Sequence, residues 1–300
     1  MDIDDARLLA EIAHRGSFAD AARDRDVGPS SISRIVSALE TELGFRIFQR
    51  TTRRVTLTEA GEIYLRRIGS AVDDFESARD DALAVSVGPV GRLRMTATVA
   101  FGQKVVVPIV PLFKARYPRV DLELVFSDAN LDLVTERIDL AVRHGAQLTG
   151  DLVVTKLRDT TYRVCASPAY LERAGRPRAP RDLSERECLR FALPGFRSRW
   201  LFRIAGSEAF EVPVRGGLVA SGALAMHGLT LAGMGPALLA DWLVDEDLAA
   251  GRLIDLFPEF QVTATTFETA VWLLYPSRSF LPLKVRAMID FLKAGSSVAA

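Results

Sequence analysis

Seven side chains near the start of the chain have the chemistry of a nucleic-acid contact. Three hydroxyls and one guanidinium lie close together in the sequence, at Ser30, Ser31, Ser33 and Arg34. Seryl hydroxyls bind phosphate oxygens, and an arginine can donate two parallel hydrogen bonds to the edge of a guanine. A basic group follows, at Arg50, Arg53 and Arg54. These arginines would bind the phosphate backbone and add affinity that is independent of base sequence.

The local sequence places Arg34 and the serines on one face of a helix. Ser17 followed by Asp20 is a capping-box pattern, so a first helix should begin directly after Ser17, and residues 26–28 should end it. Pro29 suits the first position of a second helix. The apolar residues of that helix recur at spacings of four, three and four, which predicts one buried stripe: Ile32, Val36, Leu39 and Leu43.

A short helix, a tight turn and a second helix with exposed hydroxyls are typical of helix-turn-helix proteins that read a major groove. Gly44 should end the second helix in a left-handed conformation. Short strands predicted over 45–48 and 55–57 would enclose the basic group as a wing. The alternative is two packed helices whose serine face is only solvated, and periodicity alone does not separate these two interpretations.

Residues 16–61 resemble the N-terminal signature of the LysR-type transcriptional regulators nearly position for position. The matching pieces are Gly16-Ser17-Phe18, Ala21-Ala22, Ser33-Arg34, Leu39-Glu40, Leu43-Gly44, Phe48, Arg50 and Leu57-Thr58-Glu59-Ala60-Gly61. The resemblance implies an all-α winged helix-turn-helix domain over 1–58 that binds promoter DNA, with a supporting first helix over 4–14. Many members have Gln where this chain has Pro29, which leaves open the base that is read there.

The linker 59–87 is predicted to be a long helix with one apolar seam. Thr58 is a good N-cap, and the apolar residues then alternate at four and three: Tyr64, Ile68, Ala71, Phe75, Ala78, Ala82 and Val85. We interpret the seam as a dimerisation surface, because nothing obvious in a monomer covers it. The alternative is a helix packed on its own chain. The resemblance implies paired linker helices that join two DNA-binding domains.

The composition indicates a cytoplasmic protein with two well-packed domains. The 300 residues are 49% hydrophobic and 25% charged, and Cys165 and Cys188 are too few for a disulfide framework. The acidic start MDIDDARLLAEIA is unlike a secretory signal, and the apolar runs are too short to span a bilayer, so no membrane partner is expected. A formal net charge of zero counts mildly against nucleic acid, but a local arginine patch, doubled in a dimer, can still bind phosphates.

From the hinge at Gly88-Pro89 onward, the pattern changes to alternating strands and helices. Strands are predicted over 93–97, 120–127, 138–143, 164–167, 189–193, 217–220 and 270–275. Helices are predicted over 105–117, 131–136, 223–232, 237–241 and 281–294. Such alternation is typical of an α/β fold with parallel sheets and helices on both faces.

This half resembles the effector-binding domain of the same family, which is similar to the two-lobed periplasmic binding proteins. The matching pieces are Gly91-Arg92-Leu93-Arg94, Phe101-Gly102, Tyr117-Pro118, Asp139-Leu140-Ala141-Val142-Arg143, Ser167-Pro168-Ala169-Tyr170-Leu171, Gly233-Met234-Gly235 and Lys284-Val285-Arg286. The resemblance implies an effector-binding domain over 88–300, with a ligand cleft between two lobes. Lobe one would be 91–162 with 267–300, and lobe two 163–266.

Ligands of open α/β sheets bind at the carboxyl ends of strands, where helix N-termini offer amides to anions. The residues expected there are Thr98, Ala100, Phe101, Ser127, Arg143, Ser167, Arg199, Ser221 and Gly235. Their arginines and hydroxyls favour a small organic anion such as a carboxylate. The alternative is that Arg143 and Arg199 are surface ion-pair residues. Relatives often have Asn where this chain has Ser221.

An enzyme is the competing functional class. The only histidines, His14, His144 and His227, lack metal-ligand spacing, and no nucleophile elbow, Walker loop or complete dinucleotide fingerprint is present. We therefore predict no catalytic residue, no metal and no cofactor. A third class is an architectural DNA-binding protein without an effector. The favoured prediction is a LysR-type regulator that binds double-stranded DNA as a homodimer or homotetramer and responds to a small anionic effector.

Overall fold

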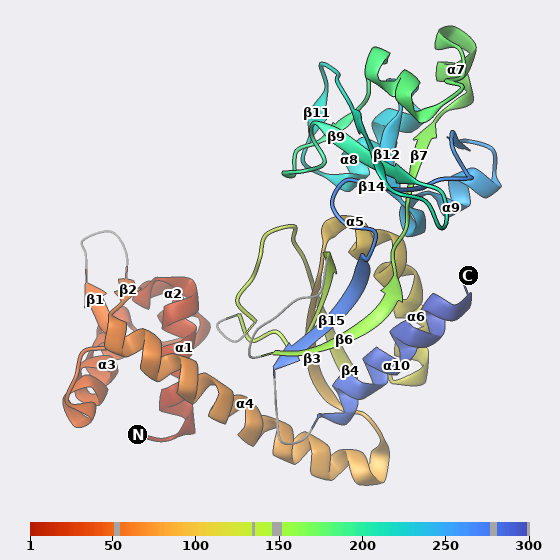
Figure 1. Cartoon of the computed structure of the whole chain (residues 1–300). Helices are drawn as coiled ribbons and strands as arrows, with labels where there is room; N and C mark the ends of the chain where they lie inside the picture. The colour runs from red at the N-terminus through yellow and green to blue at the C-terminus, as the bar shows by residue number, and fades with distance from the viewer. Residues whose placement is uncertain (51–54, 134–135, 146–151, 277–280, 299–300) are drawn as a thin grey trace.

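The chain forms an N-terminal helical domain, one long helix and two α/β lobes, arranged in that order (Figure 1). The computed structural model describes residues 1–50, 55–133, 136–145, 152–276 and 281–298. The predicted fold class is confirmed: a winged helix-turn-helix unit precedes a long linker helix and a two-lobed α/β domain.

The N-terminal domain has the local structure that its sequence predicts. Its elements are α1 (Ile3–Arg15), α2 (Phe18–Asp24), α3 (Pro29–Leu43), β1 (Phe48–Arg50) and β2 (Val55–Leu57). The Ser17 side chain caps α2 by accepting a hydrogen bond from the backbone N–H of Asp20, and Pro29 is the first residue of α3. Gly44 ends α3 with φ 78°, in the left-handed region. Ile32, Val36 and Leu39 are buried in the core of this domain, as predicted, whereas Leu43, the fourth residue of the predicted stripe, is half-buried against it.

The first wing strand begins later than predicted, at Phe48 and not at residue 45. The Glu40 side chain explains the shift, because it accepts hydrogen bonds from the backbone N–H groups of Ile47 and Phe48 at 2.8 and 3.0 Å. These bonds tie the segment before β1 to α3. The ladder with β2 therefore begins only at the pair Phe48–Leu57.

Helix α4 (Glu59–Val87) is 29 residues long and leads from the helical domain to the first lobe (Figure 1). Thr58 is its N-cap, as predicted, and accepts a hydrogen bond from the N–H of Gly61 at 2.9 Å. Gly88 follows the last turn with φ 78°.

The first lobe contains a five-stranded sheet of mixed direction in the order β4-β3-β5-β15-β6. Its strands are β3 (Gly91–Ala97), β4 (Val120–Phe126), β5 (Leu140–Gly145), β6 (Leu152–Asp159) and β15 (Ala270–Pro276). Strand β3 is parallel to β4 and β5, whereas β15 is antiparallel to β5 and β6. Helices α6 (Val107–Arg116) and α10 (Leu283–Val298) complete the core with Phe113, Met288 and Leu292.

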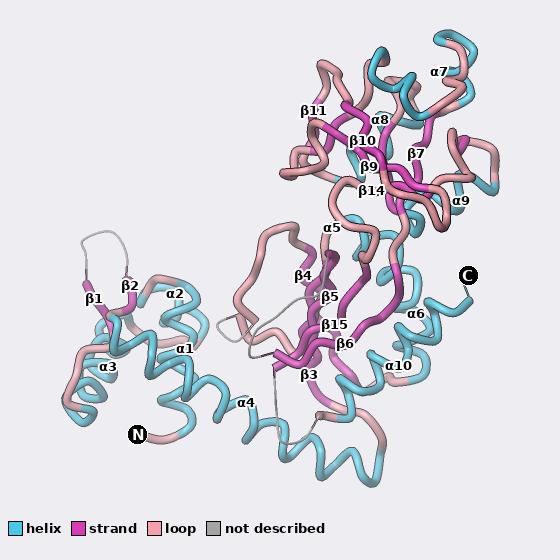
Figure 2. Tube along the Cα trace, in the orientation of Figure 1, coloured by secondary structure: helices cyan, strands magenta, loops and turns pink. Residues whose placement is uncertain are grey.

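The second lobe is built on a separate sheet in the order β10-β9-β14-β7-β12, with β13 also paired to β7 (Figure 2). Its strands are β7 (Tyr162–Ala166), β9 (Arg199–Arg203), β10 (Phe210–Pro213), β12 (Ala237–Ala240), β13 (Ile254–Asp255) and β14 (Gln261–Thr263). The short strands β8 (Arg190–Phe191) and β11 (Val219–Ala220) form a parallel pair of their own. Around these sheets lie α7 (Pro168–Ala174), the 3₁₀ helix η2 (Pro180–Glu185), α8 (Ala223–Leu231) and α9 (Asp241–Ala249).

The predicted parallel sheets are wrong for this lobe, because every strand pair of its larger sheet is antiparallel. The chain crosses between the lobes twice, through β6–β7 and through β14–β15. Strand β7 leaves the crossing and β14 returns to it, so the two run in opposite directions when they pair. The same argument explains why β15 is antiparallel to β6 in the first lobe. Tyr162, expected as the last residue of lobe one, pairs with Ala240 in the second sheet.

Three helix predictions in the lobes also need correction. Residues 237–240 form strand β12, whose residues are all buried, and helix α9 begins at Asp241. The described residues of 131–136 form no helix, and residues 134–135 lie outside the description. The helix predicted over 105–117 starts earlier, with α5 (Val99–Phe101) and a π-helical turn η1 (Gly102–Val106) before α6. Gly102 permits that turn, because a Cβ there would lie 2.4 Å from the Phe126 ring.

Candidate nucleic-acid interface and effector cavity

The predicted DNA-contacting side chains of α3 lie opposite its buried stripe. Ser30 and Arg34 are exposed, while Ser31 and Ser33 are half-buried. In the described part of the chain, no hydrogen bond or ion pair engages the Arg34 guanidinium, which leaves its donors available. The N-cap of α3 is Gly28, and no side chain caps the first turn. A helix N-terminus without a side-chain cap and a nearby exposed guanidinium are suited to phosphate and base contacts.

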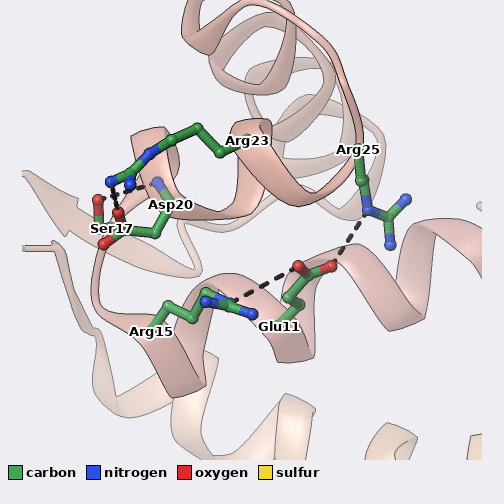
Figure 3. Close-up of polar contacts among 6 residues, drawn as sticks. All are labelled: Glu11, Arg15, Ser17, Asp20, Arg23 and Arg25. Carbon is green, nitrogen blue, oxygen red and sulfur yellow. Dashed lines mark hydrogen bonds and ion pairs between the residues drawn. The ribbon is translucent and has the colours of Figure 1, made fainter.

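Three other arginines of this region, Arg15, Arg23 and Arg25, lie against carboxylates (Figure 3). Arg25 Nε lies 3.1 Å from Glu11 Oε2, and Arg15 Nε lies 3.8 Å from Glu11 Oε1. Arg23 pairs with Asp20 within α2. The contact between Arg25 and Glu11 joins the end of α2 to α1, and the two carboxylates offset two of these three positive charges. The unmatched positive charge at this end of the domain therefore includes Arg34.

The wing is described only in part. Strands β1 and β2 pair antiparallel from Phe48–Leu57 to Arg50–Val55, so the two strands predicted around the basic group are present. Arg50 ends β1, and Arg53 and Arg54 lie outside the described residues.

The predicted seam of α4 divides into two parts. Tyr64 packs against Phe45 of its own domain, with ring centroids 5.2 Å apart, and Ile68 is half-buried. From Ala71 onward the seam is exposed to solvent in the single chain. Phe75 is 61% exposed and Val85 is 84% exposed. The alternative of a seam packed on its own chain therefore does not describe this second part.

A cavity of about 560 Å³ is lined by residues of both lobes. The crossing is held by hydrogen bonds of Thr160 N–H to Thr269 O at 2.9 Å and of Thr269 Oγ1 to Thr160 O at 2.8 Å. Four of the predicted effector residues line the cavity: Thr98, Ala100, Arg143 and Ser221. The cavity is also lined by residues outside the predicted effector set, including Asp128, Asn130, His144, Tyr162, Phe191, Phe196 and Trp242.

Arg143 is the basic group of this cavity, and its side chain is held by neutral oxygens. Its Nη1 donates to Val142 O at 3.0 Å and its Nη2 to Thr96 Oγ1 at 3.3 Å. Burial lowers the pKa of the Arg143 guanidinium, and the carboxylate of Asp128 acts in the opposite direction. An arginine keeps its proton in proteins, so the cavity contains a half-buried positive charge. The ion-pair alternative does not describe Arg143 within the described residues, but it does describe Arg199, which is exposed and paired with Glu211.

An aromatic stack joins the lobes at the cavity. The His144 ring from β5 stacks on Trp242 of α9, with centroids 5.1 Å apart and an interplanar angle of 28°. Phe101 packs edge-on against both rings. Burial, and then the charge of Arg143, lower the pKa of His144 to about 4, so this histidine is neutral at pH 7. Burial also raises the pKa of Tyr162 to about 12, so its phenol is neutral as well.

Five predicted effector residues do not line this cavity. Phe101 is fully buried in the first lobe's core, Ser127 accepts a hydrogen bond from the N–H of Ala129, and Arg199 lies in the exposed ion pair with Glu211. Ser167 is the buried N-cap of α7. Gly235 is buried where a Cβ would lie 2.4 Å from the carbonyl oxygen of Glu187.

The direction of β7 explains the misplacement of Ser167 and Gly235. Because β7 runs away from the crossing, its first residue, Tyr162, lines the cavity, and Ser167 lies beyond its far end. Gly235 precedes β12, whose Ala237 pairs with Cys165 near that far end. The rule that ligands bind at the carboxyl ends of strands holds for parallel sheets and fails in an antiparallel one.

The described residues contain no helix with the length and apolar character needed to cross a membrane. Within the same residues, no group of three or more His, Cys, Asp or Glu side chains could hold a metal ion. Both cysteines are free and buried, and burial raises the pKa of each thiol, which reduces thiolate reactivity.

Comparison with known proteins covers both parts of the chain. Residues 3–62 match the bacterial regulatory helix-turn-helix proteins of the lysR family, and residues 86–297 match the LysR substrate binding domain. The transcriptional regulator CrgA of Neisseria meningitidis (serogroup C, strain 8013) is 34% identical over 285 residues, which cover 95% of this chain and 94% of that protein. The regulator DmlR of Escherichia coli K12 is 32% identical over 293 residues, covering 97% and 93%.

Solved structures have the same architecture over the full length. CrgA of Neisseria meningitidis superposes with a TM-score of 0.62 at 31% identity, covering 98% of both chains. The virulence activator AphB of Vibrio cholerae superposes with a TM-score of 0.59 at 26% identity, covering 98% of this chain and 99% of that chain. The chain belongs to the LysR family, as a DNA-binding transcriptional regulator with a winged helix-turn-helix domain and an effector-binding domain.

Proposed function

We propose that this regulator contacts promoter DNA through α3 and its wing, forms homo-oligomers through α4, and responds to a small organic anion in the inter-lobe cavity. The observation that carries the effector assignment is the half-buried Arg143 guanidinium, which lines the cavity and has no ion-pair partner among the described residues. We further propose that the protein acts in the cytoplasm and by binding rather than catalysis, which the similarity to proteins named transcriptional regulators supports.

The proposed DNA contacts divide into two kinds. Arg34, exposed and without a partner among the described residues, is assigned to a base edge, with Ser30, Ser31 and Ser33 beside it. Arg50, Arg53 and Arg54 are assigned to phosphates on either side of the wing. Phosphate contacts hold the domain in register, whereas base contacts give sequence preference. Pro29 has no side-chain donor, so it reads no base by hydrogen bonding.

Replacing Arg34 by alanine is expected to weaken binding to the cognate operator by about 1–3 kcal/mol and to flatten discrimination at one base pair. Arg34→Lys retains the charge but loses the two-pronged donor, so it should restore affinity more than discrimination. Arg53→Ala should weaken all duplexes alike and reduce the salt slope by about one. The measurement is competition between operator and scrambled duplexes at several salt concentrations. Equal, sequence-independent losses for Arg34→Ala and Arg53→Ala would remove the base-reading role.

The proposed effector response follows from the position of the cavity. Thr98, Ala100 and Arg143 come from the first lobe, while Ser221 comes from the second, so a ligand in the cavity would contact both lobes. A ligand shifts the balance between lobe arrangements only by its different affinity for each. Contacts to both lobes provide that difference. Through Gly88 and α4, the shift would alter the spacing of two winged helices on DNA.

The anion assignment predicts a difference between two arginine variants. Organic acids that bind should stabilise the wild type by about 2.7 kcal/mol at a hundredfold excess over Kd. Arg199→Ala, which removes an exposed arginine outside the cavity, should retain this stabilisation, whereas Arg143→Ala should lose it. Thermal-shift screening of an acid library on the three proteins makes the measurement. Hits that stabilise Arg143→Ala as much as the wild type would show that Arg143 does not bind the anion.

A response to an effector would distinguish the proposed regulator from an architectural DNA-binding protein, which needs no effector. A stabilising acid should change the length of the protected DNA segment in a nuclease footprint. A footprint that is identical with and without every stabilising acid would favour the architectural alternative.

A further inference from the structure

The inter-lobe cavity contains one charge of each sign. Asp128, directly after β4 and Ser127, and Arg143 of β5 both line it. They interact electrostatically, since the Asp128 carboxylate acts to raise the pKa of Arg143 against the effect of burial. Among the described residues, no ion pair within 4.0 Å joins them. The cavity therefore presents a cation and an anion that are close but do not neutralise each other by contact.

The Asp128 carboxylate is exposed and is positioned by one backbone hydrogen bond. Its Oδ1 accepts a hydrogen bond from the backbone N–H of Val99 at 3.0 Å, at the N-terminus of α5. The amides of a helix N-terminus favour an anion, and here the chain supplies that anion itself. A ligand carboxylate at Thr98–Ala100 would meet like charge. Asp128 lines the cavity, and its other oxygen, Oδ2, has no hydrogen-bond partner in the described part of the chain, so the carboxylate can bind a cationic group.

The remaining polar side chains of the cavity carry no charge near pH 7. His144, with a pKa of about 4, and Tyr162, with a pKa of about 12, are both neutral there. Much of the lining from the second lobe is apolar: Phe191, Leu193, Phe196, Leu238 and Leu243. The cavity volume of about 560 Å³ lies within the range of small-molecule sites. The site thus combines two opposite charges on one lobe with an apolar wall on the other.

We propose that the effector is a zwitterion with an apolar body, such as an α-amino acid with an aromatic or large aliphatic side chain. The ligand's carboxylate binds Arg143, its ammonium binds Asp128, and its side chain packs against the second lobe. In such a ligand the ammonium and the carboxylate are attached to the same α-carbon. This arrangement suits a site in which Arg143 and Asp128 are close but form no ion pair. A simple carboxylate would leave Asp128 unmatched beside it, and a simple amine would leave Arg143 unmatched. The inference rests on the proposed function, in which the cavity binds the effector.

The test compares ligands that differ in one group. Calorimetric titration and thermal shift of the full-length protein would use phenylalanine, leucine and tryptophan. The comparison compounds are 3-phenylpropionate, which lacks the ammonium, 2-phenylethylamine, which lacks the carboxylate, and glycine, which lacks the apolar body. At least one of the three amino acids should bind at least ten times more tightly than each comparison compound.

The Asp128→Asn variant supplies the matched control. Asparagine retains an oxygen for the Val99 N–H but removes the charge, so amino-acid binding should fall at least tenfold while 3-phenylpropionate binding is unchanged or tighter. If 3-phenylpropionate binds the wild type as tightly as phenylalanine, and Arg143→Ala loses both, the zwitterion is overturned and the organic-anion proposal stands. If 2-phenylethylamine binds more tightly than both phenylalanine and 3-phenylpropionate, the zwitterion proposal and the organic-anion proposal both fail. Absence of binding by all three amino acids also overturns the zwitterion, and the acid screen then tests the anion independently.

Discussion

Phe75→Asp is expected to convert the protein into folded monomers that bind operator DNA about a hundredfold more weakly. Phe75 lies in the exposed part of the α4 seam and is 61% exposed in the single chain, so the substitution removes little packing within the chain. In a helix pair the aspartate would be buried without a partner, at a cost of several kcal/mol that separation of the helices avoids. Two linked DNA-binding domains gain about 10² to 10⁴ in affinity over one, which sets the size of the loss.

Leu83→Asp is the matched control for this substitution. Leu83 is a large apolar residue on the same helix, 47% exposed, and lies outside the predicted seam. The same charge placed there should leave the oligomer intact. Sedimentation gives the mass, operator titration the affinity, and circular dichroism the fold. An unchanged mass and native operator affinity for Phe75→Asp would mean that the oligomer forms elsewhere.

Gly61→Ala should destabilise the N-terminal domain by about 1–3 kcal/mol or more, because overpacking at a close backbone contact forces the backbone to move. A Cβ at this position would lie 2.2 Å from the carbonyl oxygen of Ile47. The same oxygen accepts a hydrogen bond at 2.9 Å from the N–H of Thr58, the N-cap of α4. Displacing Ile47 therefore disturbs the start of α4 and the segment that Glu40 holds before the wing. We expect operator binding to be lost while effector binding remains.

Gly69→Ala provides the comparison, since it is the same change in the same helix with no atom within 4 Å of the added Cβ. Helix propensity alone should make it stabilising by up to about 1 kcal/mol. Urea unfolding of each variant, followed by the signal of the N-terminal domain, measures the difference. Equal effects of the two substitutions would show that the contact between Gly61 and Ile47 does not constrain the domain.

The helix boundaries of the DNA-binding domain were predictable because they depend on contacts between near neighbours. A serine side chain caps a helix through an N–H three residues away, as Ser17 does with Asp20. Pro29 favours the start of α3 and Gly44 favours its end, because of the backbone angles that each residue adopts readily. The buried stripe of α3 follows from helical periodicity alone. The wing strand was predicted too early because Glu40 binds the backbone seven residues further on, a contact that no local pattern shows.

The effector cavity was only partly predictable, because its lining is assembled by the direction in which strands cross between lobes. Thr98 and Arg143 were identified from the ends of parallel strands, where the general rule applies. Ser167 was misplaced because β7 runs away from the cavity, and strand direction is decided by pairing with distant β14 and β12. Residues 237–240 form a strand for the same reason, since a short apolar run takes its structure from its partner.

The sequence by itself determined the family, the DNA-binding domain and its exposed arginine, because these depend on spacings within a few turns of helix. Only the tertiary structure decided which charges share the cavity. Asp128 follows β4 and Arg143 lies in β5, so the connection between these strands separates them in the sequence. Tyr162 and Trp242 come from the other lobe. Side chains so far apart in the chain meet only when sheet pairing and the double crossing place them together, and no local periodicity encodes that pairing.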